Sequence, residues 1–138
     1  MQVGPVPVLA GRTRERKAEH IRICLEAEVE ARKVSTWLEH VWLIHRALPE
    51  VDYGQVDVRT GFLGHEFSAP IIVSSMTGGT EEAIPINKAI ARAVEELGLG
   101  MGVGSQRAAL EEPGLARTFR VAREEAPTAF IMANIGYQ

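Results

Sequence analysis

The sequence has few of the residues on which several classes of protein depend. Its 138 residues include one cysteine, Cys24, which excludes an internal disulfide framework and a zinc cluster built on cysteines. Aromatic residues make up only 6%, and 15 basic residues are outnumbered by 18 acidic ones, whereas nucleic-acid modules rely on basic excess and stacking aromatics. No apolar run approaches the ~20 residues of a membrane-spanning helix, and residues 1–9 lack the basic start of a secretory signal. We therefore expect a cytoplasmic protein with no nucleic-acid or membrane partner.

The amino-acid composition indicates one globular core, and the sequence pattern indicates two segments that precede this core in the chain. Hydrophobic residues make up 46% and charged residues 24% of the chain, a balance typical of a folded domain. Residues 1–12 contain two prolines and two glycines without periodicity, which predicts a flexible N-terminal arm. We expect an N-terminal extension over residues 13–69 and the main α/β fold over residues 70–138.

The extension is predicted to begin with an amphipathic helix and to end in a small hairpin. Thr13 is the expected N-cap of the helix. Its apolar stripe, at three- and four-residue steps, comprises Ile21, Cys24, Leu25 and Val29. On this stripe Cys24 is expected to be a small core residue. Val56 and Val58 alternate with charged residues, and the segment 62–67 that follows, with Gly64 at a turn, predicts the hairpin.

The region between the helix and the hairpin is harder to assign. Pro49 ends whatever element precedes it. The apolar side chains that are candidates to face a core are Trp37, Leu38, Val41, Trp42 and Ile44.

Three short apolar runs recur at a regular interval after residue 69. They begin at Ile71, Gly100 and Ala129, so each starts 29 residues after the previous one. Helical patterns fill the two intervals. An array of this rhythm predicts a parallel βαβαβ unit with right-handed crossovers.

Both intervening helices have typical end signals. Thr80 is expected to cap the first helix and Gly98 to end it. Pro113 falls in the first turn of the second helix, and Pro127 ends that helix. The side chains expected to face the core are Ile86, Ile90, Val94 and Leu97 in the first helix, and Leu115, Phe119 and Ala122 in the second.

Small and polar residues follow each predicted strand. The strand ends read S-S-M-T-G-G at 74–79, G-S-Q-R at 104–107 and N-I-G at 134–136. Doubly wound sheets and (β/α)₈ barrels both place their chemistry at such strand ends. None of these segments contains the G-x-G-x-x-G fingerprint or a P-loop, which favours the barrel. We expect an α/β fold, the N-terminal part of a TIM (β/α)₈ barrel with about three of its βα units.

Four motifs follow one another along the chain. They are R-K-A-E-H at 16–20, A-P-I-I-V-S-S-M-T-G-G-T at 69–80, G-M-G-V-G-S-Q-R-A-A-L at 100–110 and A-N-I-G at 133–136. Together they resemble the motifs of type 2 isopentenyl-diphosphate isomerases. The resemblance implies an FMN-dependent TIM-barrel isomerase of isoprenoid biosynthesis, which interconverts isopentenyl and dimethylallyl diphosphate by an allylic proton shift. The implied cofactors are FMN, Mg²⁺, and NADPH or NADH as the reductant of the flavin.

The same resemblance implies which residues form the site. The implied substrate-binding residues are Arg16, Lys17, His20, Ser105, Gln106 and Arg107. The implied flavin contacts are Met76, Thr77, Gly78, Ser105 and Asn134. A guanidinium fork beside an ammonium group suits the oxygens of a diphosphate.

No catalytic or metal-binding residue is assigned within this chain. The family's Gln-Glu pair for substrate and Mg²⁺, its flavin lysine and its late phosphate-binding loops would all lie beyond Gln138. We therefore expect residues 1–138 to be inactive alone. The resemblance also implies a homo-oligomer, a tetramer or octamer, for the complete enzyme.

Two departures and two alternatives accompany this resemblance. Trp37 stands where the family has a glycine, and Tyr137 where an alanine usually follows the glycine. One alternative is another FMN-dependent barrel, such as a 2-hydroxy-acid oxidase, although Arg16, Lys17 and the triplet at 105–107 speak against it. The other is a non-catalytic barrel fragment or oligomerisation module, which would associate through its unpaired sheet edges.

Overall fold

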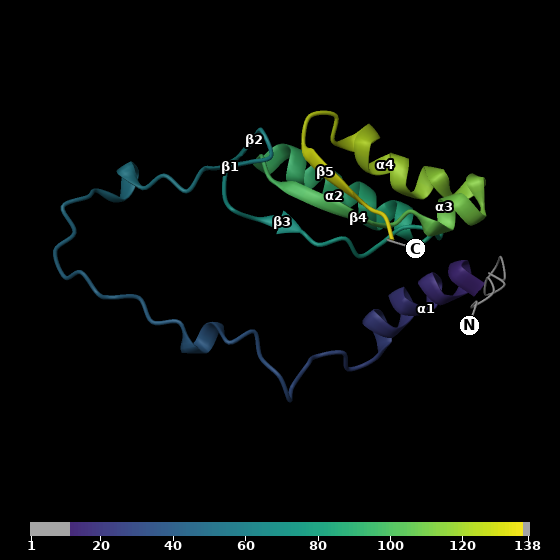
Figure 1. The fold of residues 1–138 in the computed structure, drawn as a ribbon, viewed down its shortest axis with the longest axis horizontal. Coiled ribbons are helices and arrows are strands. Elements are labelled where there is room, and N and C mark those ends of the chain that lie inside the picture. The colour runs from purple at the N-terminus through teal and green to yellow at the C-terminus, as the bar shows by residue number, and fades with distance from the viewer. Residues whose placement is uncertain (1–11, 137–138) are drawn as a thin grey trace, which may run out of the picture.

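The computed structural model describes residues 12–136, and their central feature is a parallel βαβαβ unit (Figure 1). Its strands are β3 (Ile72–Val73), β4 (Gly100–Ser105) and β5 (Phe130–Asn134), hydrogen-bonded in that order. Both pairings are parallel. The predicted three-strand array is thereby confirmed.

Helices connect the strands and pack against each other over the sheet. The two long ones are α2 (Ala83–Leu97) and α4 (Arg117–Glu125). Before α4 the chain forms the short helix α3 (Arg107–Glu111) and the 3₁₀ helix η3 (Pro113–Ala116). The sequence did not predict α3, because five residues are too few to show a helical period.

The hydrophobic core lies between the sheet and these helices. Its buried members are Ala91, Val94, Met101, Val103, Ala108, Leu115, Phe119, Ala122 and Ala126. The inward positions predicted for Leu115, Phe119 and Ala122 are therefore confirmed. They alternate at helical spacing because only one side of η3 and α4 meets the sheet.

The buried face of α2 differs from the predicted stripe. Its buried residues are Ala83, Asn87, Ala91 and Val94, while Ile86 and Ile90 are half-buried. Leu97 is 58% exposed, so its predicted inward position is wrong. Val94 is nevertheless buried as predicted, and Ile90 packs against the core from a half-buried position.

The predicted helix ends are confirmed at the C-termini. Gly98 caps α2 with a φ of +63°, a left-handed conformation that favours glycine. The end of α4 at Glu125 precedes Pro127 as expected. At its start α2 differs, because the Thr80 hydroxyl accepts a hydrogen bond from the N–H of Glu82 at 3.2 Å but the helix begins only at Ala83. Thr80 is thus not the N-cap residue.

The predicted hairpin is also confirmed. It consists of β1 (Thr60–Phe62) and β2 (His65–Phe67), paired antiparallel around Gly64 at a φ of +78°. Phe67 is buried, and its ring centroid lies 5.5 Å from that of Phe130 at the start of β5. The hairpin therefore packs at the amino-terminal end of the sheet, away from the strand ends predicted to carry the chemistry.

Helix α1 (Arg12–Glu26) departs from the prediction in its ends and in its apolar stripe. Thr13 lies inside the helix and is not its N-cap, and Val29 lies beyond its last residue. Cys24 is exposed, so its predicted core position is wrong. The physical reason is that the stripe of α1 faces a cavity and is not packed against the sheet.

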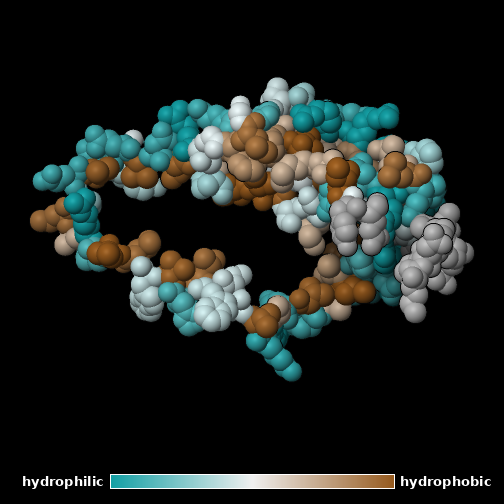
Figure 2. All heavy atoms as spheres, in the orientation of Figure 1, coloured by the Kyte–Doolittle hydropathy of each residue, from teal (hydrophilic) through white to brown (hydrophobic). Residues whose placement is uncertain are grey.

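Residues 27–59, here called the connecting segment, form a long arc between α1 and the hairpin (Figure 1). Its only helical turns are the 3₁₀ helices η1 (Leu38–His40) and η2 (Tyr53–Gln55). Much of its apolar surface is open to solvent in the space-filling view (Figure 2).

The candidate core residues of the connecting segment are all exposed. Their exposed fractions are 71% for Trp37 and Leu38, 62% for Val41, 86% for Trp42 and 98% for Ile44. The prediction that they face a core is therefore wrong for the described residues. Burial requires an opposing apolar surface, and the arc lies away from the βαβαβ unit.

Two further predictions meet the limits of the described residues. Residues 1–11 of the predicted N-terminal arm lie outside the described residues. Tyr137 and Gln138, at the other end of the chain, also lie outside them. Among the helices between residues 12 and 136, none is long and apolar enough to cross a membrane.

Candidate functional site

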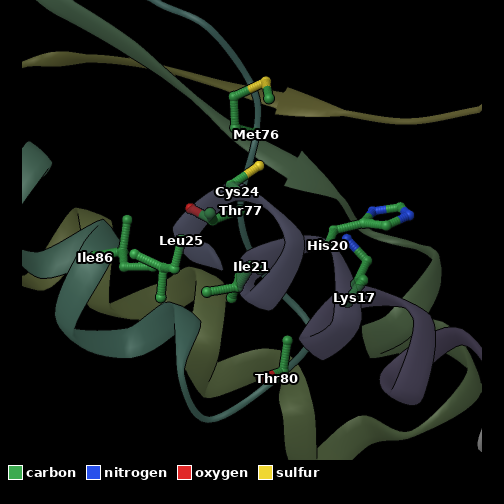
Figure 3. Close-up of a pocket in the computed structure, with 10 residues that line it drawn as sticks. Lys17, His20, Ile21, Cys24, Leu25, Met76, Thr77, Thr80 and Ile86 are labelled. Atoms are coloured by element: carbon green, nitrogen blue, oxygen red, sulfur yellow. The ribbon is translucent and has the colours of Figure 1, made fainter. Parts of the chain in front are cut away.

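A cavity opens between α1 and the loop that follows β3 (Figure 3). Its volume is about 230 Å³, and its lining residues are Lys17, His20, Ile21, Cys24, Leu25, Met76, Thr77, Gly78, Thr80 and Ile86. Figure 3 shows apolar side chains such as Leu25 and Ile86 toward one end and the polar groups of Lys17 and His20 toward the other. The cavity thus combines an apolar wall with cationic and hydrogen-bonding groups.

Residues 74–80, here called the β3 loop, form the sheet side of this cavity. Gly78 and Gly79 adopt φ values of +143° and +83°, which other residues rarely adopt. A Cβ atom at Gly78 would overlap the Phe119 ring, and one at Gly79 would lie 2.5 Å from the Cβ of Ala108. The two glycines allow the loop backbone to lie directly on the helices beneath it.

Two buried polar side chains hold the β3 loop from below. Asn87 of α2 and Thr118 of α4 are 1% and 0% exposed, and both bond to the loop. A pattern of apolar positions alone does not predict these two residues. The available signal was a polar residue, Asn87, four positions after Ala83 and four before Ala91 on one buried helix face.

Lys17 brings a positive charge to the β3 loop. Its Nζ atom lies 5.9 Å from the centroid of the Phe119 ring, within the range of a cation–π contact. Partial burial, and secondarily the positive charge of Arg16, lower the pKa of Lys17. An anion in the cavity would counter both effects by favouring the charged form.

The other two substrate-binding candidates on α1 are more exposed than Lys17. His20 lines the cavity although its side chain is exposed. Arg16 is absent from this lining and borders a separate hollow with Thr13, Glu15 and Glu19. The structure therefore brings Lys17 and His20 to the β3 loop and directs Arg16 to a neighbouring surface.

The ends of β4 and β5 meet beside the β3 loop. Ser105 pairs with Asn134 across the sheet, after an irregularity in register that follows Val103. The N–H of Gln106 donates to the Asn134 carbonyl at 2.9 Å. The side chain of Gln106 donates back to the Gly104 carbonyl at 3.1 Å. These bonds fix three of the predicted site residues at one strand end.

A backbone hydrogen bond ties this strand end to the β3 loop. The N–H of Gly104 donates to the Thr77 carbonyl at 2.7 Å. Arg107 begins α3 with an exposed side chain, and its N–H lies 3.4 Å from the Ser105 hydroxyl. The ends of β3, β4 and β5 therefore form one continuous rim, and the predicted flavin and substrate residues other than those of α1 all lie on it.

The rim fits the ring system of FMN, the cofactor implied by the motifs. The edge of an isoalloxazine both donates and accepts hydrogen bonds, and its faces pack against apolar groups. Thr77, Ser105 and Asn134 provide hydroxyl and amide groups. Met76 provides a 73% exposed apolar side chain, and Gly78 lets the loop backbone between Met76 and Gly79 lie against the Phe119 ring.

A metal centre is not assembled by the described residues. Between residues 12 and 136, no group of three His, Cys, Asp or Glu side chains is placed to hold a metal ion.

Comparison with known proteins places the chain among flavoproteins. A profile described as FMN-dependent dehydrogenase matches residues 10–130. The chain is 53% identical over 124 residues to an isopentenyl-diphosphate delta-isomerase from Methanosarcina barkeri, and 55% identical over 124 residues to one from Archaeoglobus fulgidus. The matched part is 90% of this chain and 34% and 35% of the two relatives. The chain thus spans about a third of the length of these curated relatives.

Proposed function

Because the chain belongs to the family of FMN-dependent dehydrogenases, we propose that it supplies the first strands of an FMN-binding (β/α)₈ barrel that acts as an isopentenyl-diphosphate isomerase. The observation that carries this proposal is the single rim formed by the three strand ends, with Lys17 facing it from α1. In barrels of this kind the chemistry lies at that end of the strands. The domain plan follows, with an arm over residues 1–12, an extension over 13–69 and barrel strands over 70–138.

In this proposal the rim residues contact the flavin. Met76, Thr77 and Gly78 receive it at the β3 loop, and Ser105 and Asn134 at the next two strand ends. Reduced FMN held there would supply an acid group for the substrate alkene and an electron-rich face beside positive charge. The protein orients the ring and excludes water from the apolar wall of the cavity.

The substrate diphosphate is bound by the cationic and polar groups around the cavity. Lys17 and His20 border the cavity itself, and Arg16 lies one residue before Lys17 on the same helix. The triplet Ser105, Gln106 and Arg107, at the end of β4, completes the proposed set. An apolar wall beside cationic groups suits a ligand with a short hydrocarbon part and a diphosphate.

The resemblance of the motifs supports the remaining parts of the proposal. They are a requirement for Mg²⁺, flavin reduction by NADPH or NADH, a cytoplasmic location and assembly into a homo-oligomer. The substrates are isopentenyl and dimethylallyl diphosphate.

A chimera tests the proposed function. Residues 12–136 replace the matching third of the Archaeoglobus fulgidus relative, and the purified protein is assayed with isopentenyl diphosphate, Mg²⁺ and reduced FMN. We expect a flavin-containing protein that forms dimethylallyl diphosphate. A folded chimera that binds FMN but oxidises a 2-hydroxy acid, without isomerising the diphosphate, would instead favour the oxidase class.

Variants of α1 test the diphosphate contacts within that chimera. Lys17→Gln removes a half-buried cation at the cavity and is expected to raise KM about tenfold or more, because a charge-assisted contact contributes about 1.5–3 kcal/mol. Arg22→Gln removes a cation of the same helix that instead bonds to Glu19 at 3.2 Å and serves as the control. Equal KM values for the two variants would contradict the role given to Lys17.

A further inference from the structure

Two buried polar side chains anchor the β3 loop to the helices without lining the cavity. Asn87 and Thr118 lie on α2 and α4, and both are buried where these helices pack together. Small apolar residues would suffice for such a helix contact, as Ala91 and Ala122 show. A buried amide is costly unless its polar atoms are bonded. The partners of the two side chains therefore indicate what they do.

The amide of Asn87 is oriented by two carbonyl groups. Its Nδ2 donates to the Thr118 carbonyl at 2.8 Å and lies 3.4 Å from the Thr77 carbonyl. Carbonyl oxygens only accept hydrogen bonds, so Nδ2 must face them and Oδ1 must face the Thr77 hydroxyl. That hydroxyl donates to Oδ1 at 2.6 Å.

This arrangement determines whether the Thr77 hydroxyl can donate or accept a further hydrogen bond. Because its only hydroxyl proton points to Asn87, the Thr77 oxygen has only lone pairs left for another partner. A ligand that meets the Thr77 hydroxyl must therefore donate to it and cannot accept a hydrogen bond from it. The N–H groups of an isoalloxazine meet that requirement.

Thr118 fixes the next part of the loop. Its hydroxyl accepts from the N–H of Gly79 at 2.8 Å and donates to the Leu115 carbonyl at 2.7 Å. Both functions of the hydroxyl are thus used. The left-handed backbone of Gly79 is held in place by this bond, two residues after Thr77 is held by Asn87.

We propose that Asn87 and Thr118 are positioning residues for the flavin, acting through the β3 loop. They hold the backbone from Thr77 to Gly79 in the conformation that receives the ring, and Asn87 keeps the Thr77 hydroxyl as an acceptor. The proposal rests on the proposed function, because it takes the β3 loop to be a flavin contact. Neither side chain touches the cavity directly.

Isosteric variants of the full-length protein test the proposal. Thr118→Val removes the hydroxyl and keeps the shape, whereas Thr118→Ser keeps the hydroxyl. Asn87→Asp preserves the acceptor for Thr77 but removes the donor to the Thr118 carbonyl. We measure the Kd for FMN by quenching of flavin fluorescence, and the Tm of the flavin-free protein by circular dichroism. The control is Val94→Ala. Val94 lies on α2, as Asn87 does, is 1% exposed and takes no part in the hydrogen bonds to the loop, so this substitution removes core volume only.

We expect Thr118→Val and Asn87→Asp to weaken FMN binding about tenfold or more. A loss of about tenfold in affinity corresponds to roughly one hydrogen bond to a well-placed ligand. Thr118→Ser and Val94→Ala are expected to keep the affinity for FMN, although Val94→Ala lowers Tm. Unchanged FMN affinity in Thr118→Val and Asn87→Asp would overturn the proposal while leaving the proposed function intact. An equal loss in Val94→Ala would overturn it too, since general destabilisation would then explain the effect. A parent protein that binds no FMN would overturn the proposed function and this inference with it.

Discussion

Replacing Gly104 by alanine tests whether the close approach of the β3 loop to β4 sets both stability and binding. A Cβ atom at Gly104 would lie 2.6 Å from the carbonyl oxygen of Thr77 and 2.8 Å from its carbonyl carbon. Both neighbours are backbone atoms, so they cannot turn aside as a side-chain end can. The φ of Gly104 lies outside the left-handed region, so the cost arises from lack of space and not from backbone strain.

The size of the effect follows from three contributions. Overpacking of a tight site costs about 1–3 kcal/mol. The displaced loop also lengthens the 2.7 Å hydrogen bond from Gly104 to Thr77, whose net contribution is about 0.5–1.5 kcal/mol. The lower entropy of the unfolded alanine chain offsets about 0.4–1 kcal/mol. We therefore expect a loss of about 2 kcal/mol in the free energy of unfolding, on the same principles.

Urea unfolding of the full-length protein measures this loss, with Gly114→Ala as the matched control. Gly114 has nothing within 4 Å of its would-be Cβ, so the same substitution there should be neutral or slightly stabilising. We also expect Gly104→Ala to weaken FMN binding, because Thr77 must move. If Gly104→Ala were as stable as Gly114→Ala, the packing argument for the rim would be refuted.

Three further expectations concern charge and packing. Because the pKa of Lys17 is lowered, its charge is lost at a lower pH than that of an ordinary lysine, and KM for the diphosphate should begin to rise at that lower pH. Lys17→Arg should flatten this rise in a KM–pH profile. The Glu95 carboxylate accepts hydrogen bonds from three donors of the turn before β5, namely the N–H and hydroxyl of Thr128 and the N–H of Ala129, and its pKa is lowered chiefly by the Thr128 hydroxyl. The stabilisation by Glu95 is thus fully present above the pKa that its carboxyl has in the unfolded chain, and it is lost as the pH falls through the lower pKa of the folded protein. Glu95→Gln should therefore lower Tm at neutral pH, and this decrease should become smaller in acid. The control Glu96→Gln should leave Tm unchanged. Met101→Ala, at a fully buried site, should cost about 2–5 kcal/mol in urea unfolding, whereas exposed Met76→Ala should stay within about 0.5 kcal/mol.

The sequence predicts the α/β unit well because its signals are local. The β-branched run before Ser74 and the regular 29-residue interval place the strands. Gly98 and Pro127 mark the helix ends for steric reasons that hold in any context. The hairpin around Gly64 follows from the same kind of local rule.

What the sequence does not predict depends on partners far along the chain. Cys24 and Trp42 carry the hydrophobicity typical of a core, yet burial depends on an opposing surface that hydrophobicity alone does not supply. Asn87 and Thr118 escape an apolar pattern because their role lies in bonds to residues 10 and 39 positions away, at Thr77 and Gly79. Their detection required the loop and both helices in place.

The motifs locate the rim but not its internal geometry. The motifs identify Ser105 and Asn134 as separate candidates, whereas the sheet register shows that the two residues are directly paired. They also treat Arg16 and Lys17 as one unit, whereas the helical turn directs the two side chains to different hollows. Successive residues on a helix point about 100° apart, so one neighbour of a pair usually faces elsewhere.

The connecting segment makes α1 a tethered part of the site. Confining the two ends of residues 27–59 costs about 3 kcal/mol of chain entropy by the logarithmic law for loop closure, and few contacts of the segment itself offset this cost, since its side chains are exposed. After a single peptide cleavage within the arc, α1 would be held to the sheet and its loops only by contacts such as the Arg14–Glu112 ion pair and Lys17 over the Phe119 ring. The α1 side of the cavity is therefore joined to the strand-end rim, along the chain, only through this exposed arc.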